Sequence, residues 1–161
     1  MEVYDYAIQM EKDGESYYRS AVAKVAHKGI RTILTMLADD EAAHCHIIEN
    51  MKKGEKTHLG GTKTIARVKN IFLKMAESDD YSMVHLSEID LYRKAQDIEQ
   101  KTMDFYREKA DKAVDAYEKA VLLKLADEEK RHYFILENIV EFVSRPEQWL
   151  ENPEWYHIEE Y

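Results

Sequence analysis

The chain has 161 residues, with 23 lysines and arginines against 32 aspartates and glutamates, so its formal net charge is −9. This length suits one domain with a sizeable core, and the acidic balance argues against nucleic acid as a partner, because phosphates repel such a surface. The single cysteine, Cys45, excludes an internal disulfide and any metal site built from four cysteines.

The composition favours a helical, cytoplasmic protein. Five glycines and two prolines provide few loop signals, and residues that favour helices are abundant. We expect neither a signal peptide nor a membrane span, because the chain begins with no basic and apolar leader and has no run of about 18 apolar residues. A lone cysteine suits the reducing cytoplasm.

Residues 2–53 are predicted to form a helix hairpin. Apolar residues recur with a helical period over about 2–28 and again over about 30–53. Gly29 is the expected end of the first helix, because glycine readily adopts the left-handed conformation that ends helices. Gly54 is the expected end of the second helix.

Residues 54–87 are predicted to form a crossover between two hairpins. Its middle contains one short amphipathic pattern, marked by Ile65, Val68, Phe72 and Met75. This segment is long for a tight connection. It is long enough to return the chain from one end of a bundle to the other.

A second hairpin is predicted over 88–144, with helices over about 88–111 and 115–144. Ser87 is its expected start, because serine caps helix N-termini and an aspartate follows three residues later. The predicted architecture is therefore one all-α domain over 1–161.

The predicted tail, residues 145–161, follows the last helix of the second hairpin. It contains both tryptophans of the chain, Trp149 and Trp155. Exposed tryptophans are unfavourable on a soluble protein, so we expect both to dock on the bundle or on a partner chain.

The sequence repeats a Glu-x-x-His pattern. Glu41 and His44 recur 88 residues later as Glu129 and His132. Residues three apart on a helix leave the same face, so each carboxylate and imidazole can bind one metal ion. A single copy is a weak signal, but the same offset also relates two lone glutamates, Glu11 and Glu99.

The spacing of these residues places them at one level of a bundle. Glu11 and Glu41 are 30 residues apart, as are Glu99 and Glu129. In an antiparallel hairpin, residues equally far from the turn lie side by side, and the midpoints, 26 and 114, fall at the predicted turns. That level is about 22 Å from each turn at 1.5 Å per residue. Two such hairpins bring four glutamates and two histidines together.

Four carboxylates in a helical interior repel one another and are costly to desolvate. Two divalent cations would cancel their charge. The mixed oxygen and nitrogen set suits iron or manganese, with zinc as a further candidate. This is the ligand pattern of ferritin-like di-iron bundles, in which two helices each provide a glutamate and two provide Glu-x-x-His.

Several motifs carry a family resemblance, and together they span nearly the whole chain. They are Ala7-Ile8-x-x-Glu11-x-x-Gly14-x-x-Tyr17-Tyr18, Leu37-Ala38-x-x-Glu41-x-x-His44, Glu99 with Phe105-Tyr106, and Leu125-Ala126-x-x-Glu129-x-x-His132. In these motifs the sequence resembles the rubrerythrin branch of the ferritin-like superfamily. The resemblance implies a four-helix bundle with a long crossover between helices two and three, a short C-terminal tail and a dinuclear iron site. The resemblance implies Glu11 and Glu99 as terminal ligands and Glu41 and Glu129 as bridging ligands. It implies one histidine for each iron, His44 and His132.

The chain departs from the family pattern in two ways. Typical rubrerythrins append a rubredoxin domain with four cysteines, whereas this chain has one cysteine. They also carry a second carboxylate on the third helix, three residues from the first, whereas here Gln96 and Thr102 flank Glu99 at that distance. The second difference puts rubrerythrin-style peroxide chemistry in doubt.

Four further side chains are candidates for supporting the metal. Tyr18 and Tyr106 lie seven residues after Glu11 and Glu99, so each shares a face with its glutamate. They are the candidate catalytic residues, and the alternative is that they are core aromatics with hydrated hydroxyls. Asp40 and Glu128 either accept a hydrogen bond from the outer nitrogen of the opposite histidine or face solvent.

The leading function is a cytoplasmic di-iron oxidoreductase that reduces hydrogen peroxide or O2 with electrons from a separate rubredoxin-like donor. We expect a homodimer. One alternative is a ferroxidase that stores iron in a ferritin-type shell. Another is a metal-dependent interaction module without turnover. The mass in solution separates storage from the others, because a shell needs about two dozen chains.

Overall fold

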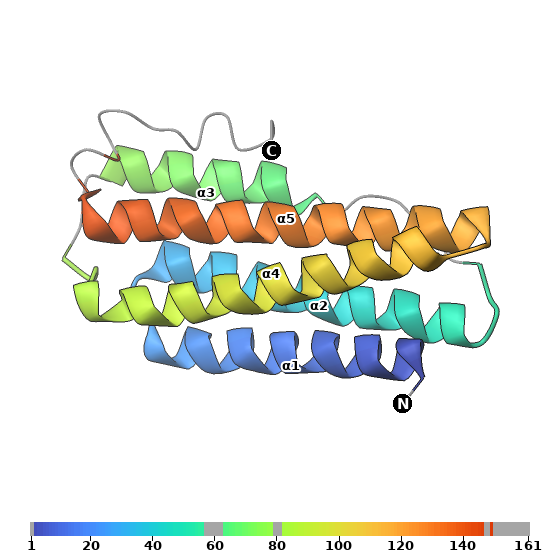
Figure 1. Cartoon of the computed structure of the whole chain (residues 1–161). Helices are drawn as coiled ribbons and strands as arrows, with labels where there is room; N and C mark the ends of the chain where they lie inside the picture. The colour runs from blue at the N-terminus through green and yellow to red at the C-terminus, as the bar shows by residue number, and fades with distance from the viewer. Residues whose placement is uncertain (1, 57–62, 79–81, 147–148, 150–161) are drawn as a thin grey trace.

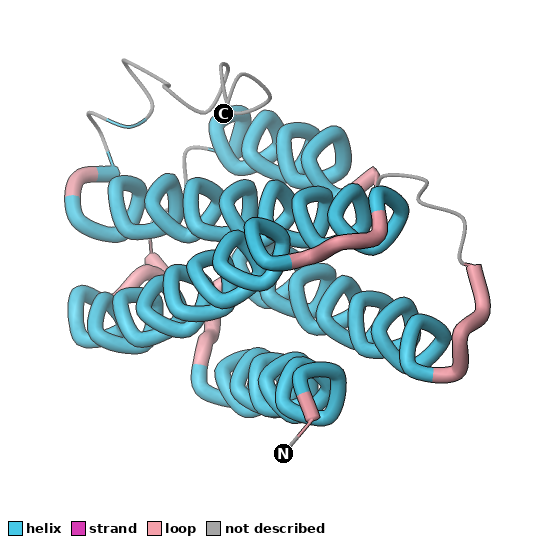
Figure 2. Tube along the Cα trace, turned by 45° about the vertical axis from the view of Figure 1, so that its right-hand side comes forward, coloured by secondary structure: helices cyan, strands magenta, loops and turns pink. Residues whose placement is uncertain are grey.

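The computed structural model describes residues 2–56, 63–78, 82–146 and 149, and every regular element in these ranges is helical. The four long helices are α1 (Val3–Lys24), α2 (Lys28–Lys52), α4 (Ile89–Lys112) and α5 (Ala116–Ser144). A shorter helix, α3 (Thr64–Ser78), lies in the crossover, and a 3-10 helix, η1 (Leu86–Glu88), precedes α4. Figure 2 shows these helices and the loops that join them.

The four long helices form two antiparallel hairpins. Helix α1 packs mainly against α2 and α4 mainly against α5, and the hairpins meet through α1 with α4 and α2 with α5. Helix α3 lies outside this bundle (Figure 1), and it packs against α2. The arrangement confirms the predicted ferritin-like four-helix bundle with a long crossover. None of the helices in the described part of the chain is both long and apolar enough to cross a membrane.

The two hairpin turns lie where the spacing of the repeat places them. The first occupies residues 25–27, centred on 26, and the second occupies 113–115, centred on 114. The expected role of Gly29 is wrong, because α1 ends at Lys24 and Gly29 lies in the first turn of α2. The physical reason is a competing cap: His27 Nδ1 accepts a hydrogen bond from the backbone N–H of Ile30, 3.3 Å away, and so begins α2.

The ends of the crossover confirm one prediction and correct another. Gly54 follows α2 with a φ of 77°, the left-handed conformation that glycine adopts without strain. Ser87 does not begin the next helix, because it lies inside η1. His85 is the capping residue there, and the Glu88 carboxylate accepts a hydrogen bond from its backbone N–H at 3.2 Å.

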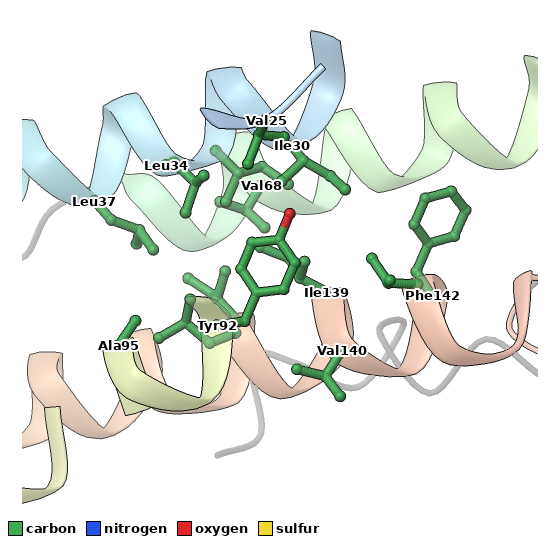
Figure 3. Packing of buried hydrophobic residues seen from close by; sticks show 14 of the residues in the cluster. Val25, Ile30, Leu34, Leu37, Val68, Tyr92, Ala95, Ile139, Val140 and Phe142 are labelled. Carbon is green, nitrogen blue, oxygen red and sulfur yellow. The ribbon is translucent and has the colours of Figure 1, made fainter. Parts of the chain in front are cut away.

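One apolar cluster joins the crossover to both hairpins. Val68 and Phe72 of α3 are fully buried in it. Figure 3 shows Val68 near Ile30 and Leu34 of α2. Trp149 is 5% exposed, and its ring centroid lies 4.8 Å from Phe142 and 5.4 Å from Phe72. The expected docking of Trp149 on the bundle is confirmed, whereas Trp155 lies outside the described residues. These contacts hold α3 against the bundle.

Candidate metal centre

The structure brings the six predicted ligand residues together in the middle of the bundle. Each of the four long helices contributes, and none of the six residues is more than 2% exposed. The residues are Glu11 on α1, Glu41 and His44 on α2, Glu99 on α4, and Glu129 and His132 on α5. Such burial of four carboxyl groups needs compensation by cations or protons.

These residues form two overlapping groups, each able to hold a metal ion. In each group one candidate atom from every residue lies within 4.8 Å of the others. Glu41 and Glu129 belong to both groups, as expected of bridging carboxylates. The first group is completed by Glu11 and His44, and the second by Glu99 and His132.

Both histidines direct Nδ1 into the centre. His44 Nδ1 lies 2.9 Å from Glu129 Oε1, and His132 Nδ1 lies 3.0 Å from Glu41 Oε1. Each imidazole therefore contacts a shared carboxylate of the opposite hairpin. The two rings lie nearly parallel, with centroids 5.8 Å apart and an angle of 17° between their planes.

The outer nitrogen of each histidine contacts a carboxylate from the opposite hairpin. His132 Nε2 lies 2.9 Å from Asp40 Oδ2, and His44 Nε2 contacts Glu128 Oε2. Of the two roles left open for Asp40 and Glu128, the structure supports the contact with histidine. Because the outer nitrogen donates to a carboxylate, Nδ1 is left to face a metal.

Two tyrosines cross the bundle to the unshared glutamates. Tyr18 donates a hydrogen bond to Glu99 Oε1, and Tyr106 donates one to Glu11 Oε1. Both rings are at most 1% exposed, so the hydroxyls are not hydrated core groups. Burial, followed by the charges of nearby glutamates, raises the pKa of both phenols, so they remain protonated donors.

The six residues shift one another's pKa values, upward for some and downward for others. Burial and the charges of neighbouring glutamates raise the pKa of Glu41 and Glu129 well above the usual range. For Glu11 and Glu99 burial is outweighed by His44 and His132 respectively, which lower the pKa. Burial lowers the pKa of both histidines, but the surrounding carboxylates outweigh it and raise the pKa. The shared glutamates and both imidazoles therefore favour their protonated forms, while the unshared glutamates favour the ionised form.

Three carboxylate oxygens show that the site fits metal ions. Oε2 of Glu11, Glu99 and Glu129 is buried, yet accepts no hydrogen bond from an N–H or hydroxyl group of the described residues. A buried carboxylate oxygen without a partner is costly. Divalent cations would satisfy these oxygens, and oxygen with imidazole ligands suits iron, manganese or zinc.

Two residues beside the centre were not assigned roles from the sequence. An added Cβ on Gly14 would lie 2.9 Å from Glu41 Oε2, so this glycine makes room for a shared carboxylate. Thr64 of α3 donates a hydrogen bond to Asp40. Gly14 belongs to the first motif of the family resemblance, but no role was predicted for it. No motif or repeat in the sequence includes Thr64.

Gln96 and Thr102 stand where rubrerythrins carry a second carboxylate, and both side chains form hydrogen bonds outside the metal centre. Gln96 Nε2 donates to Glu137 Oε2 at 2.8 Å, and Arg93 donates to the Gln96 side-chain oxygen at 2.8 Å. Thr102 donates to the backbone oxygen of Ile98 at 2.9 Å. Neither position offers a carboxylate, so the six residues above form the whole predicted set.

Comparisons with known proteins agree with this geometry. A model of the rubrerythrin family matches residues 2–140, which is most of the chain. No curated protein matches the sequence. Among solved structures, a hypothetical protein from Pyrococcus furiosus is similar, with 19% sequence identity, 89% of each chain covered and a TM-score of 0.65. That likeness shows the fold alone, but the family model and the arrangement of the centre agree. The chain belongs to the rubrerythrin family.

Proposed function

We propose that the protein is a di-iron carboxylate oxidoreductase that reduces hydrogen peroxide or O2 with electrons from a separate donor. The main support is the pair of overlapping groups that share two carboxylates. The family supports iron as the metal, because rubrerythrins are di-iron proteins. The proposed ligands are Glu11 and His44 for one iron, Glu99 and His132 for the other, and Glu41 and Glu129 for both.

Two bound iron ions would supply two electrons and coordination positions for a small oxidant. Reducing one hydrogen peroxide to two waters consumes two electrons and two protons. Electrons must therefore return from outside after each turnover. The six ligands are at most 2% exposed, which restricts the oxidant to a molecule as small as peroxide or O2.

The tyrosines are proposed to hold the unshared carboxylates in place. Tyr18 and Tyr106 keep their protons, because burial raises the pKa of both phenols, and each donates its hydrogen to a proposed ligand. This contact fixes one oxygen of Glu99 and of Glu11 and leaves the other for metal. It also places a phenolic proton beside the reacting centre.

The donor is proposed to be a rubredoxin-like protein or domain. These 161 residues contain one cysteine, so they include no four-cysteine iron site. We propose that the protein works in the cytoplasm as a homodimer. A dimer encloses no cavity for mineral, in contrast to a storage shell.

The experiment is anaerobic reconstitution with Fe(II), elemental analysis and addition of peroxide. We expect close to two irons per chain and about one peroxide consumed per pair of irons before the reaction stops. Adding a rubredoxin and its reductase should restart consumption. A His44→Ala variant is the matched control, because it removes one proposed ligand and leaves Glu41 and Glu129.

Three outcomes would overturn the proposal. One is a single metal per chain that His44→Ala does not affect. Another is an iron-loaded protein that neither peroxide nor O2 oxidises. The third is sustained oxidation of Fe(II) with soluble mineral and a mass of about two dozen chains, which would establish ferroxidase and storage instead.

A further inference from the structure

The Thr64 hydroxyl of the crossover helix contacts a carboxylate that lies behind the proposed metal centre. Thr64 is the first residue of α3, and its Oγ1 lies 2.7 Å and 2.9 Å from the two carboxylate oxygens of Asp40. Asp40 Oδ2 lies in turn 2.9 Å from His132 Nε2. The Thr64 hydroxyl is therefore two contacts from a proposed ligand.

The pattern of α3 shows that this hydroxyl stands at an otherwise apolar position. The buried residues of α3 are Thr64, Val68, Phe72 and Met75, which recur every three or four residues along one face. Thr64 is 6% exposed and is the polar member of these four. Valine has nearly the same shape and would suit the buried face better, so packing alone does not account for threonine.

The helix that carries Thr64 is held firmly. Val68 and Phe72 are fully buried in the cluster shared with α2 and α5, and Trp149 packs against Phe72. Asp40 is itself only 7% exposed, so its carboxylate is confined by both contacts. A fixed helix, a fixed hydroxyl and a confined carboxylate together define the orientation of one imidazole.

We propose that Thr64 is a positioning residue for one of the two metal positions, the one formed with Glu99 and His132. Its hydroxyl orients Asp40, and Asp40 holds the hydrogen on His132 Nε2 so that Nδ1 faces the metal. The crossover helix is thus part of the metal centre's support. This inference rests on the metal centre proposed above and adds that the two metal positions respond differently to a change in α3.

The test uses zinc, which is diamagnetic, and the full chain with Thr64→Val. Zinc titration should show one of the two sites weakened by up to about tenfold, because losing the partner that contacts a metal-binding histidine costs about 10- to 100-fold and Thr64 acts on that partner. Nitrogen NMR of the histidine rings should show changed Nε2–H signals for His132 and unchanged signals for His44. Asp40→Asn should reproduce the pattern if Thr64→Val folds poorly.

The controls separate positioning from packing. Thr64→Ser keeps the hydroxyl and should restore both the zinc affinity and the His132 signals. Thr35→Val removes an exposed hydroxyl on α2, which donates to the backbone oxygen of Arg31, and should change neither. Circular dichroism and thermal unfolding would confirm that each variant keeps the fold.

Equal weakening of both zinc sites, or unchanged His132 signals in Thr64→Val, would overturn the role of Thr64. Loss of affinity that Thr64→Ser does not restore would also overturn it. If the wild-type protein binds fewer than two zinc ions, the dinuclear centre itself is wrong. The Nε2–H signal of His132 in the zinc-free protein then still decides whether Thr64 orients that ring.

Discussion

Tyr18 of α1 donates its hydroxyl hydrogen to Glu99 of α4, a residue 81 positions further along the chain. The corresponding contact runs in the opposite direction between the hairpins, where Tyr106 of α4 donates to Glu11 of α1. Each hairpin therefore holds the unshared glutamate of the other. This exchange links the assembly of the bundle to the geometry of the centre, because the tyrosine that donates to each unshared glutamate comes from the opposite hairpin.

Replacing Tyr18 with phenylalanine should weaken metal binding. The ring stays but Glu99 loses a donor, so we expect affinity for Fe(II) or zinc to fall about tenfold or more. The metal-free protein should lose about 1.5–3 kcal/mol, the usual value for a hydrogen bond to a charged group. Metal titration and denaturant unfolding in chelator measure the two effects.

Tyr17→Phe is the matched control for this variant. Its hydroxyl donates to the backbone oxygen of Leu91 at 2.5 Å and contacts no proposed ligand. We expect a smaller loss of stability, about 1 kcal/mol, and unchanged metal affinity. Equal metal affinity in both variants would show that the Tyr18 hydroxyl does not support the centre.

Metal loading should release protons from the proposed ligands. The pKa of each of His44, His132, Glu41 and Glu129 is raised, which favours a bound proton on each group in the metal-free protein. Ligands must lose these protons to bind metal, so loading with two divalent ions should release protons. Calorimetry in two buffers with different ionisation enthalpies gives the number. Release of no protons would show that all four groups are already deprotonated in the metal-free protein.

Gly14→Ala should damage the centre more than the fold. Alanine in a helix interior normally gains about 1 kcal/mol over glycine, but here its Cβ would lie 2.9 Å from Glu41 Oε2. The Glu41 side chain can move in the metal-free protein, so stability in chelator should change by less than about 1 kcal/mol. A metal would hold that carboxylate in place, so the rise in melting temperature on loading should shrink.

Ser20→Ala is the control for Gly14→Ala, because it changes an exposed position of the same helix. Its melting temperature should rise with metal as much as that of the wild type. If Gly14→Ala keeps the full metal-induced rise, the space beside Glu41 is unimportant for binding.

The meeting of the six residues was predictable because a hairpin converts sequence distance into height. Glu11 and Glu41 are equally far from residue 26, and the observed turn at 25–27 is centred there. The error at Gly29 arose from two competing signals, a glycine that can end a helix and a histidine that can begin one. The histidine prevails because its ring accepts the Ile30 N–H.

The supporting residues were harder to predict for a physical reason. Asp40 and Glu128 each precede a core glutamate, and a helix turns about 100° per residue, so their orientation depends on how each helix is rotated. The contact of Thr64 depends on where α3 crosses α2, which only tertiary packing decides. No repeat or period in the sequence encodes that crossing.

The Glu129→Gln variant tests whether Glu129 is a metal ligand or a packing residue. Burial, followed by the charges of Glu11, Glu41 and Glu99, raises the pKa of Glu129 well above the usual range, which favours the neutral carboxyl group in the metal-free protein. Glutamine matches that neutral group in size. The metal-free variant should therefore be no less stable than the wild type, while iron should stabilise it much less.

The stability difference between Glu129→Gln and the wild type should change with pH in a defined direction. In the wild type, the folded carboxyl group keeps its proton while the unfolded one ionises above about pH 4.3, so stability falls as pH rises. Glutamine does not titrate, so the variant's advantage in chelator should grow by up to about 1.4 kcal/mol per pH unit until the folded group also ionises. Thermal unfolding from pH 5 to 8, with iron and with chelator, measures both effects. Glu77→Gln, at an exposed position of α3, should follow the wild type. A metal-free Glu129→Gln protein that melts well below the wild type, or one that iron stabilises equally, would make Glu129 a structural residue.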